Sequence, residues 1–253
     1  METVAAGRIA FWEGGSLWVL DVSAAEGARN EMHAHHAFQL TFSLGGNFSF
    51  HLENGVVPGP STIVAPDTPH AFEAQGLVSL LFIEPESRAG RTLQHLMQGR
   101  SAATLSAEQA RDSPSLILQA FQHSHDPGSA LREAGLKISD RIAGHARAAE
   151  PDRRVRQIIK WASDNLDRSV GIEEAARSVQ LSPSRASHLF VEETGLPFRT
   201  YVLWLRLVRA VDAHIAGRTL TQAAQEAGFA DSAHLSRTFK RMFGVTAAAL
   251  QIS

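Results

Sequence analysis

The chain has 253 residues, of which 44% are hydrophobic and 20% are charged, and it contains no cysteine. This composition supports two domains with apolar cores, and it excludes disulfides and thiol chemistry. No apolar run approaches the ~18 residues of a transmembrane helix, and the first residues lack the basic and apolar regions of a secretion signal. We therefore expect a cytoplasmic protein with no membrane partner.

The net charge of −2 hides a difference between the two parts of the chain. Residues 1–150 contain 10 Lys/Arg and 16 Asp/Glu, whereas residues 151–253 contain 14 Lys/Arg and 10 Asp/Glu. The second part thus carries a net charge of +4, which suits a surface that faces phosphates. Because this excess is modest, contacts with bases and the fit to a groove must contribute to any DNA binding.

Residues 8–84 have the pattern of β-strands, because apolar and polar residues alternate in short runs between turns. The predicted strands are residues 8–13, 16–22, 38–44, 47–53, 61–65 and 77–84. Gly14-Gly15 and Gly45-Gly46 are typical of hairpin turns. Short strands spaced this closely predict a small barrel or roll.

Two pieces of this region are rich in histidine: His33-Ala-His35-His36-Ala-Phe-Gln39 and Pro66-Asp-Thr-Pro-His70. Histidines at i and i+2 on a strand point to one face, where they can share a metal ion with a third. The two pieces resemble the two motifs of the cupin β-barrel.

The resemblance implies a cupin-like barrel over residues 1–87, with a divalent metal (Zn, Ni or Fe) held by His33, His35, Gln39 and His70. The alternative is that these histidines pack or form hydrogen bonds without a metal, so no cofactor is certain. The sequence does not decide whether His35 or His36 faces the interior.

Five aromatic residues in the predicted strands are candidates for the wall of an effector pocket. They are Trp12, Trp18, Phe38, Phe42 and Phe50. The alternative for each of them is ordinary packing in the core.

Residues 88–147 have helical spacing of their apolar residues and are predicted to form helices. Residues 148–152 are the predicted linker to a second domain, at 153–253.

The second domain contains two units of one plan, each a short helix, a turn and a second helix. The units lie at about 171–195 and 219–244, and Ser182, Phe190 and Gly195 precede Asp231, Phe239 and Gly244 by the same spacing. Ser182 and Asp231 are good N-caps, and Thr219 with Gln222 forms a capping-box pattern. The pattern predicts two helix-turn-helix units joined by a long helix.

Residues 153–250 resemble the DNA-binding domain of the AraC/XylS family of bacterial transcription regulators. The runs GLPFRTYVLWLRLVRA and GFADSAHLSRTFKRMFGVT resemble its two signature regions. The resemblance implies an α+β two-domain protein: a cupin-like barrel followed by helices that pack or form a homodimer interface, then an all-α domain that binds promoter DNA in the major groove.

The second helix of each unit is expected to reach base edges or phosphates. The predicted DNA contacts are Ser184, Arg185, Ser187, His188, Arg199, Ser232, Ala233, His234, Ser236, Arg237, Lys240 and Arg241. Arg237 is the best candidate for a base contact, because arginine can contact guanine bidentately. Lys240, Arg241 and Arg199 are predicted phosphate contacts.

The main hypothesis is a DNA-binding regulator, not an enzyme, whose first domain senses a small effector or dimerises. RNA polymerase would be a further partner if the protein activates transcription. One alternative is a metal-dependent cupin enzyme fused to a DNA-binding domain, and another is a regulator without an effector. The sequence identifies neither the effector nor the target promoter, and does not distinguish activator from repressor.

Overall fold

The structure is a computed structural model that describes residues 5–22, 29–123, 125–144 and 151–252. It forms two compact units, one of Met1–Ala148 with Phe239–Ser253 and one of Ala149–Thr238. A sheet-rich region is followed by helices, so the predicted α+β two-domain fold class is confirmed. Of the predicted linker at 148–152, residues 148–150 lie outside the described part. In that part, no helix has the length and apolar character needed to span a membrane.

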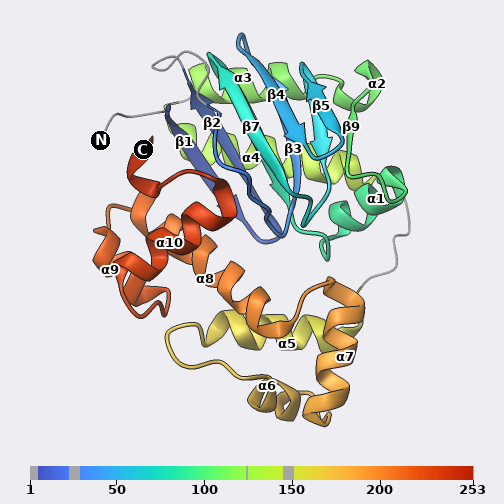
Figure 1. The fold of residues 1–253 in the computed structure, drawn as a ribbon, viewed down its shortest axis with the longest axis vertical. Helices are drawn as coiled ribbons and strands as arrows, with labels where there is room; N and C mark the ends of the chain where they lie inside the picture. Colours follow the sequence, from blue (N-terminus) through green and yellow to red (C-terminus); the bar gives the residue numbers. More distant parts are fainter. Residues whose placement is uncertain (1–4, 23–28, 124, 145–150, 253) are drawn as a thin grey trace. The chain divides into compact units, whose positions relative to one another are not determined.

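The first unit contains two β-sheets (Figure 1). Its strands are β1 (Ala5–Trp12), β2 (Gly15–Asp21), β3 (Phe38–Ser43), β4 (Asn47–Leu52), β5 (Gly55–Pro58), β6 (Ser61–Val64), β7 (His70–Gln75), β8 (Leu77–Ile83), β9 (Ala102–Thr104) and β10 (Leu250–Ile252). The seven-stranded sheet has the order β10-β1-β2-β8-β3-β6-β9, and the three-stranded sheet has the order β5-β4-β7. The last strand of the chain, β10, pairs in parallel with β1.

The two predicted hairpins have different outcomes. The first is confirmed, because β1 and β2 pair antiparallel across Gly14, with Ile9 opposite Trp18. The second is wrong: β3 pairs with β6 and β8, whereas β4 pairs with β5 and β7 of the other sheet. The Gly45-Gly46 turn carries the chain between sheets, and the N–H groups of Leu44 and Gly46 both donate to Leu77 O at 3.0 and 3.1 Å.

Four helices follow β8 in the described part of the chain, and their apolar side chains share one buried core with the large sheet. They are α1 (Arg88–Met97), α2 (Ala107–Ala110), α3 (Ser113–His123) and α4 (Pro127–Ala143). Figure 1 shows α3 and α4 behind the strands. Leu131 and Ile138 of α4 share one buried core with Phe38, Phe42 and other sheet residues. The four helices lie within residues 88–147, the region predicted to be helical, and β9 interrupts that region.

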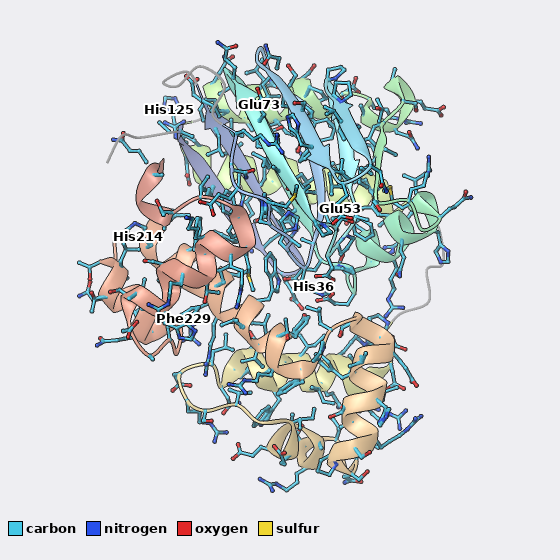
Figure 2. All side chains as sticks on the ribbon, in the orientation of Figure 1. His36, Glu53, Glu73, His125, His214 and Phe229 are labelled. Atoms are coloured by element: carbon cyan, nitrogen blue, oxygen red, sulfur yellow. The ribbon has the colours of Figure 1, made fainter. Side chains whose placement is uncertain are left out.

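The second unit is helical. Its elements are α5 (Arg153–Asp164), α6 (Ile172–Ser178), α7 (Pro183–Thr194), α8 (Phe198–Ile215), α9 (Leu220–Glu226) and the first half of α10 (Ser232–Phe243). Figure 2 labels Phe229 in the turn between α9 and α10, where its ring is buried and meets the ring of His234 edge-on at 5.2 Å. The second half of α10, the 3-10 helix at Ala247–Ala249 and β10 belong to the first unit.

Gly135 of α4 offers a test of how tightly the helix packs on the sheet. A Cβ at this position would lie 2.3 Å from the Trp12 ring, whereas a Cβ at the exposed Gly128 of the same helix would meet its nearest neighbour at 3.6 Å. We expect Gly135→Ala to lower the free energy of unfolding by roughly 1–3 kcal/mol through overpacking, despite the better helix propensity of alanine. Gly128→Ala is the control and should be neutral or slightly stabilising. Denaturant unfolding followed by circular dichroism measures both, and equal effects would contradict the packing.

Candidate functional site

The first helix-turn-helix unit consists of α6 and α7. The Ser182 hydroxyl accepts a hydrogen bond from the N–H of Arg185 at 3.3 Å, so Ser182 is the N-cap that the sequence predicts. The predicted DNA contacts of α7 are exposed or half-buried: Ser184, Arg185, Ser187 and His188. His188 Nδ1 donates to Ser184 O at 2.8 Å, so this nitrogen is engaged within its own helix.

The second unit consists of α9 and α10. Asp231 Oδ1 accepts the N–H of His234 at 2.6 Å and caps α10. Leu235, Phe239 and Phe243 follow one another at four-residue intervals along α10 and are buried. The other predicted contacts in the domain are exposed or half-buried: Arg199 in α8, and Ser232, Ala233, His234, Ser236, Arg237, Lys240 and Arg241 in α10. Ser236 donates its hydroxyl to Ser232 O at 2.8 Å, so it is partly engaged within its own helix.

Lys240 differs from the other predicted phosphate contacts. Its Nζ lies 2.7 Å from the carboxylate of Glu31, and both side chains line a cavity of the first unit. The sequence places Lys240 on a recognition helix but contains no local signal for a partner more than 200 positions away.

The three predicted metal ligands His33, His35 and His70 lie together and are buried. Their potential ligand nitrogens all lie within 4.8 Å of one another. His33 does not lie on one of the regular strands but forms an isolated bridge with His70. The bridge brings the two motifs together through a pair of backbone hydrogen bonds, each 2.9 Å long.

Hydrogen bonds fix the orientation of each of the three rings. His33 Nδ1 donates to Glu31 O at 2.9 Å, His35 Nδ1 to Ala37 O at 3.1 Å, and His70 Nδ1 to Thr68 O at 2.8 Å. With the proton on Nδ1, each ring presents the lone pair of Nε2. In each case a backbone carbonyl oxygen accepts the Nδ1 proton, so the backbone sets the same tautomer in all three rings.

The three rings are neutral. Burial is the largest cause and lowers the pKa of His33 to about 4, and it also lowers the pKa values of His35 and His70. The charge of a neighbouring imidazole lowers the pKa values of His33 and His35 further. His70 Nε2 is buried and has no hydrogen-bond partner in the described part of the chain. Neutral imidazoles with free lone pairs are the form that binds metal ions.

Gln39, the fourth predicted ligand, also reaches the histidine cluster. Its Oε1 lies 2.9 Å from His35 Nε2, and its amide nitrogen donates to Thr41 Oγ1 at 3.2 Å. Two acceptors would face each other there if Nε2 carries no proton, so either the amide is turned round or a cation lies near both atoms. A set of three imidazoles and one amide oxygen fits zinc, nickel or iron.

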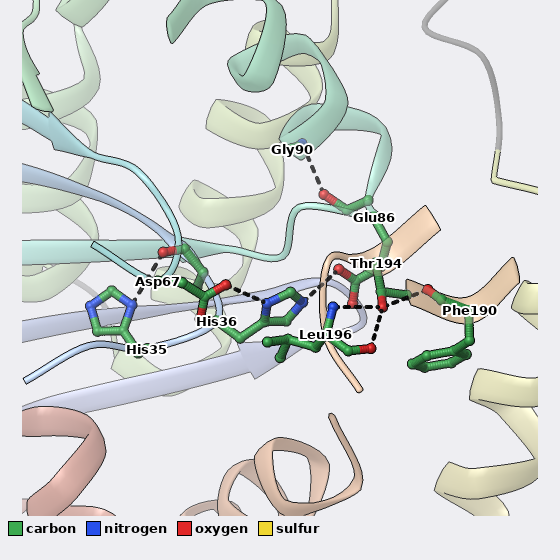
Figure 3. A network of polar contacts seen from close by, with 10 residues as sticks. His35, His36, Asp67, Glu86, Gly90, Phe190, Thr194 and Leu196 are labelled. Carbon is green, nitrogen blue, oxygen red and sulfur yellow. Dashed lines mark hydrogen bonds and ion pairs between the residues drawn. The ribbon is translucent and has the colours of Figure 1, made fainter. Parts of the chain in front are cut away.

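His36 points away from His35 and forms a separate charged cluster (Figure 3). Its Nδ1 lies 3.5 Å from Asp67 and its Nε2 lies 3.2 Å from the buried Glu86. Burial of the ring lowers its pKa, but the hydrogen bonds and charges of the two carboxylates raise it by more, to about 9. The structure thus settles which histidine joins the metal-ligand candidates: His35 does, and His36 is an imidazolium that links Asp67 to Glu86.

The first unit contains a cavity of about 370 Å³ beside the histidine cluster. Its wall includes the apolar side chains of Trp18, Leu80, Phe82 and Phe243, and it also includes His33 and Gln39. The Trp18 ring lies 5.4 Å from that of Phe82 and 4.9 Å from that of Phe243, measured between centroids. Its size and its mostly apolar wall are typical of a small-molecule site.

Only one of the five aromatic residues predicted to line an effector pocket, Trp18, lies in the wall of this cavity. Phe38 and Phe42 lie in the core between the large sheet and the helices, and Trp12 packs against that core. Phe50 is buried in the small sheet, against Phe48 and Phe72. Strand alternation shows that these side chains are buried but does not show which face of the sheet has a cavity.

A family model described as a helix-turn-helix domain matches residues 175–251. The chain is 28% identical over 186 residues to the transcriptional activator RhaS of Citrobacter koseri, an alignment that covers 70% of this chain and 63% of RhaS. It is 33% identical over 100 residues to the arabinose operon regulatory protein of Escherichia coli. Over the matched residues the chain is thus similar to transcription regulators of the AraC/XylS type.

The alignments cover only part of each relative. It is 31% identical over 93 residues to the uncharacterised regulator YpdC of Escherichia coli, which covers 35% of the chain but only 32% of YpdC. The chain therefore aligns with between a third and two thirds of the length of these relatives.

The fold of this chain is similar to crystal structures of ToxT from Vibrio cholerae. One of them, apo ToxT, has a TM-score of 0.59 at 10% identity and covers 94% of this chain and 97% of ToxT. Another, ToxT bound to an unsaturated fatty acid, has a TM-score of 0.55 at 12% identity. At this level of identity the likeness shows a shared two-domain fold.

The charged cluster at His36 predicts that two acidic side chains differ in their contribution to the free energy of unfolding. Glu86→Gln removes one counter-charge from a buried imidazolium and should lower the free energy of unfolding by roughly 2–4 kcal/mol. Glu53→Gln, at an exposed position, should change it by less than about 0.5 kcal/mol. Chemical denaturation at pH 7 measures both. Equal values would show that the cluster at His36 does not stabilise the fold.

Proposed function

We propose that this chain is a sequence-specific DNA-binding transcription regulator whose first unit binds a small effector. Two capped helix-turn-helix units carry the proposal, because the second helix of each presents polar and cationic side chains to solvent. The relatives named above are transcription regulators, and nothing in them favours the alternative of a cupin enzyme. Homodimer formation, and contact with RNA polymerase if the protein is an activator, are further parts of the proposal.

The long helix α8 supports binding to two successive turns of the major groove. It has 18 residues, which at 1.5 Å per residue corresponds to about 27 Å. One turn of DNA is about 34 Å long, so helices attached near the two ends of such a connector are suited to adjacent grooves on one face. In this arrangement α7 and α10 each read a part of one asymmetric site.

The proposed binding mode leads to a prediction about base recognition by α10. Arg237 is exposed, and we expect its guanidinium to contact a guanine. Arg237→Ala should weaken binding to a duplex selected by the protein from a random-sequence pool by about 1–3 kcal/mol and relax the preference at one base pair. Arg132→Ala removes the same charge from the exposed face of α4 and should leave the affinity unchanged. Fluorescence anisotropy measures both, and an unchanged affinity of the Arg237 variant would reject the assignment.

We propose that the effector is an amphipathic carboxylic acid that occupies the cavity beside Trp18. The apolar wall suits a hydrocarbon or aromatic body, and the cations of Lys240 and Arg29 line the same cavity. ToxT, which shares the fold, has been crystallised with an unsaturated fatty acid and with a naphthyl-substituted butenoic acid. Both of those ligands combine a carboxylate with a large apolar part.

The proposed effector class leads to a prediction about the charge of the ligand. In a thermal-shift assay, decanoic acid should stabilise the protein more than decanol, because only the acid forms a charge-assisted hydrogen bond. Lys240→Gln should remove this difference by weakening the binding of the acid about 10- to 100-fold, which corresponds to the loss of one such bond. Lys160→Gln is the control, because Lys160 pairs with Asp164 on the exposed side of α5. Equal stabilisation by acid and alcohol in the unaltered protein would exclude a carboxylate effector.

A further inference from the structure

The segment Asn30–His33 binds two distant parts of the first unit at once. On one side, Asn30 N donates to Phe72 O at 3.0 Å and Asn30 Oδ1 accepts Phe72 N at 2.6 Å, which attaches the segment to β7. On the other side, Asn30 Nδ2 donates to Phe243 O at 2.9 Å and Glu31 N donates to Gly244 O at 3.0 Å. The segment therefore closes the C-terminal end of α10, whose last carbonyl groups need donors from outside the helix.

Glu31 connects this helix end to the histidine cluster. Its carbonyl oxygen accepts the Nδ1 proton of His33, its N–H donates to Gly244 O, and its carboxylate pairs with Lys240. The fit is close: a Cβ on Gly244, which has φ +70°, would lie 2.3 Å from Glu31 O and 2.8 Å from His33 Nδ1. Glu31 thus holds the His33 ring through its carbonyl oxygen and the end of α10 through its N–H.

We infer that His33, His35 and His70 bind a divalent transition-metal ion through their Nε2 atoms, and that this ion stabilises the attachment of the end of α10 to Asn30–His33. The inference rests on the proposed function, because it assigns a metal ion as a signal that acts on DNA binding. Imidazole nitrogens select zinc, nickel or iron over magnesium and calcium, which prefer oxygen ligands.

Two observations point to a ligand at the cluster beyond the grouping of the side chains. His70 Nε2 is buried without a partner, which costs free energy unless something binds there. In addition, a backbone carbonyl accepts the Nδ1 proton of each ring, which leaves Nε2 as the candidate ligand atom; at His35 this nitrogen lies 2.9 Å from Gln39 Oε1, which is itself a predicted ligand. A histidine cluster that served packing alone would not leave a buried Nε2 unpaired.

The link to α10 follows from thermodynamic reciprocity. The ion binds best when the His33 ring is held at Glu31 O, and Glu31 is held there by Gly244 and Lys240. Whatever stabilises one end of this chain of contacts stabilises the other by the same factor. In the attached state the Lys240 ammonium is paired with Glu31 and is withdrawn from DNA phosphate, so the metal ion should weaken DNA binding.

The first test is metal binding to the full chain after treatment with a chelator. Titration with Co²⁺, followed by its visible absorption bands, should show one ion per chain with nitrogen ligands. His70→Gln should abolish this binding, whereas His51→Gln, which alters a histidine that pairs with Glu73 outside the cluster, should retain it. Circular dichroism confirms that each variant is folded, and His35→Gln replaces His70→Gln if that variant is not. Binding that survives both cluster variants, or no binding at all, would overturn the metal site.

The second test is the effect of the ion on DNA. Zn²⁺ should weaken binding to the selected duplex about tenfold, within the usual range of coupling between sites. It should also reduce the slope of log affinity against log salt concentration by about one, the change expected for the loss of one phosphate contact. Both effects require the protein with its cluster intact, and neither should occur in His70→Gln.

A matched variant separates the metal site from its coupling to α10. Asn30→Ala removes the hydrogen bonds to Phe243 and Phe72 but leaves the three ligand histidines in place. It should still bind Co²⁺, while the effect of Zn²⁺ on DNA affinity becomes much smaller. A protein that binds DNA with no response to the bound ion would overturn the inference alone. A protein that binds no DNA in either state would overturn the proposed function.

Discussion

The hydrogen bonds of the Glu31 peptide connect the parts of the first unit that carry its chemistry. Its carbonyl sets the tautomer of His33, and its N–H closes the end of α10 at Gly244. Because His33 and Gly244 are buried, leaving their polar groups unpaired costs about 1–3 kcal/mol. The peptide cannot move toward one partner without losing the other. The cavity beside Trp18 shares this constraint, since Glu31, His33 and Gly244 all line it.

Adjacent histidines in this unit have opposite protonation states because their surroundings differ. His35 is fully enclosed with two other imidazoles, so burial and like charges keep its pKa low. His36 is nearly as buried, yet two carboxylates raise its pKa to about 9. Without Asp67 and Glu86, desolvation would lower the pKa of His36 as well. The backbone between residues 35 and 36 therefore separates a neutral, ligand-like site from a structural ion cluster.

The parts of the fold that the sequence predicts well depend on local physics. Caps at Ser182, Thr219 and Asp231 act within one turn, and the stripe of Leu235 and Phe239 follows the helical period, so both are visible in the residues themselves. Strand pairing is not local: the Gly45-Gly46 turn has hairpin chemistry, but β3 finds its partners in β6 and β8. The grouping of His33, His35 and His70 was predictable only through a motif, because their distance in sequence says nothing of their distance in space.

The difference between local and distant contacts also explains why the sequence predicts only a DNA contact for Lys240. Its position on the exposed side of α10 favours a phosphate contact, and nothing near it in the sequence indicates Glu31. The consequence is electrostatic. Residues 151–253 carry a net charge of only +4, so withdrawing one cation removes a substantial part of the salt-dependent, non-specific attraction to DNA. The base contact proposed for Arg237 depends less on this non-specific electrostatic attraction. Release of Lys240 would therefore change how long the protein stays on DNA of any sequence more than it changes which sequence it prefers.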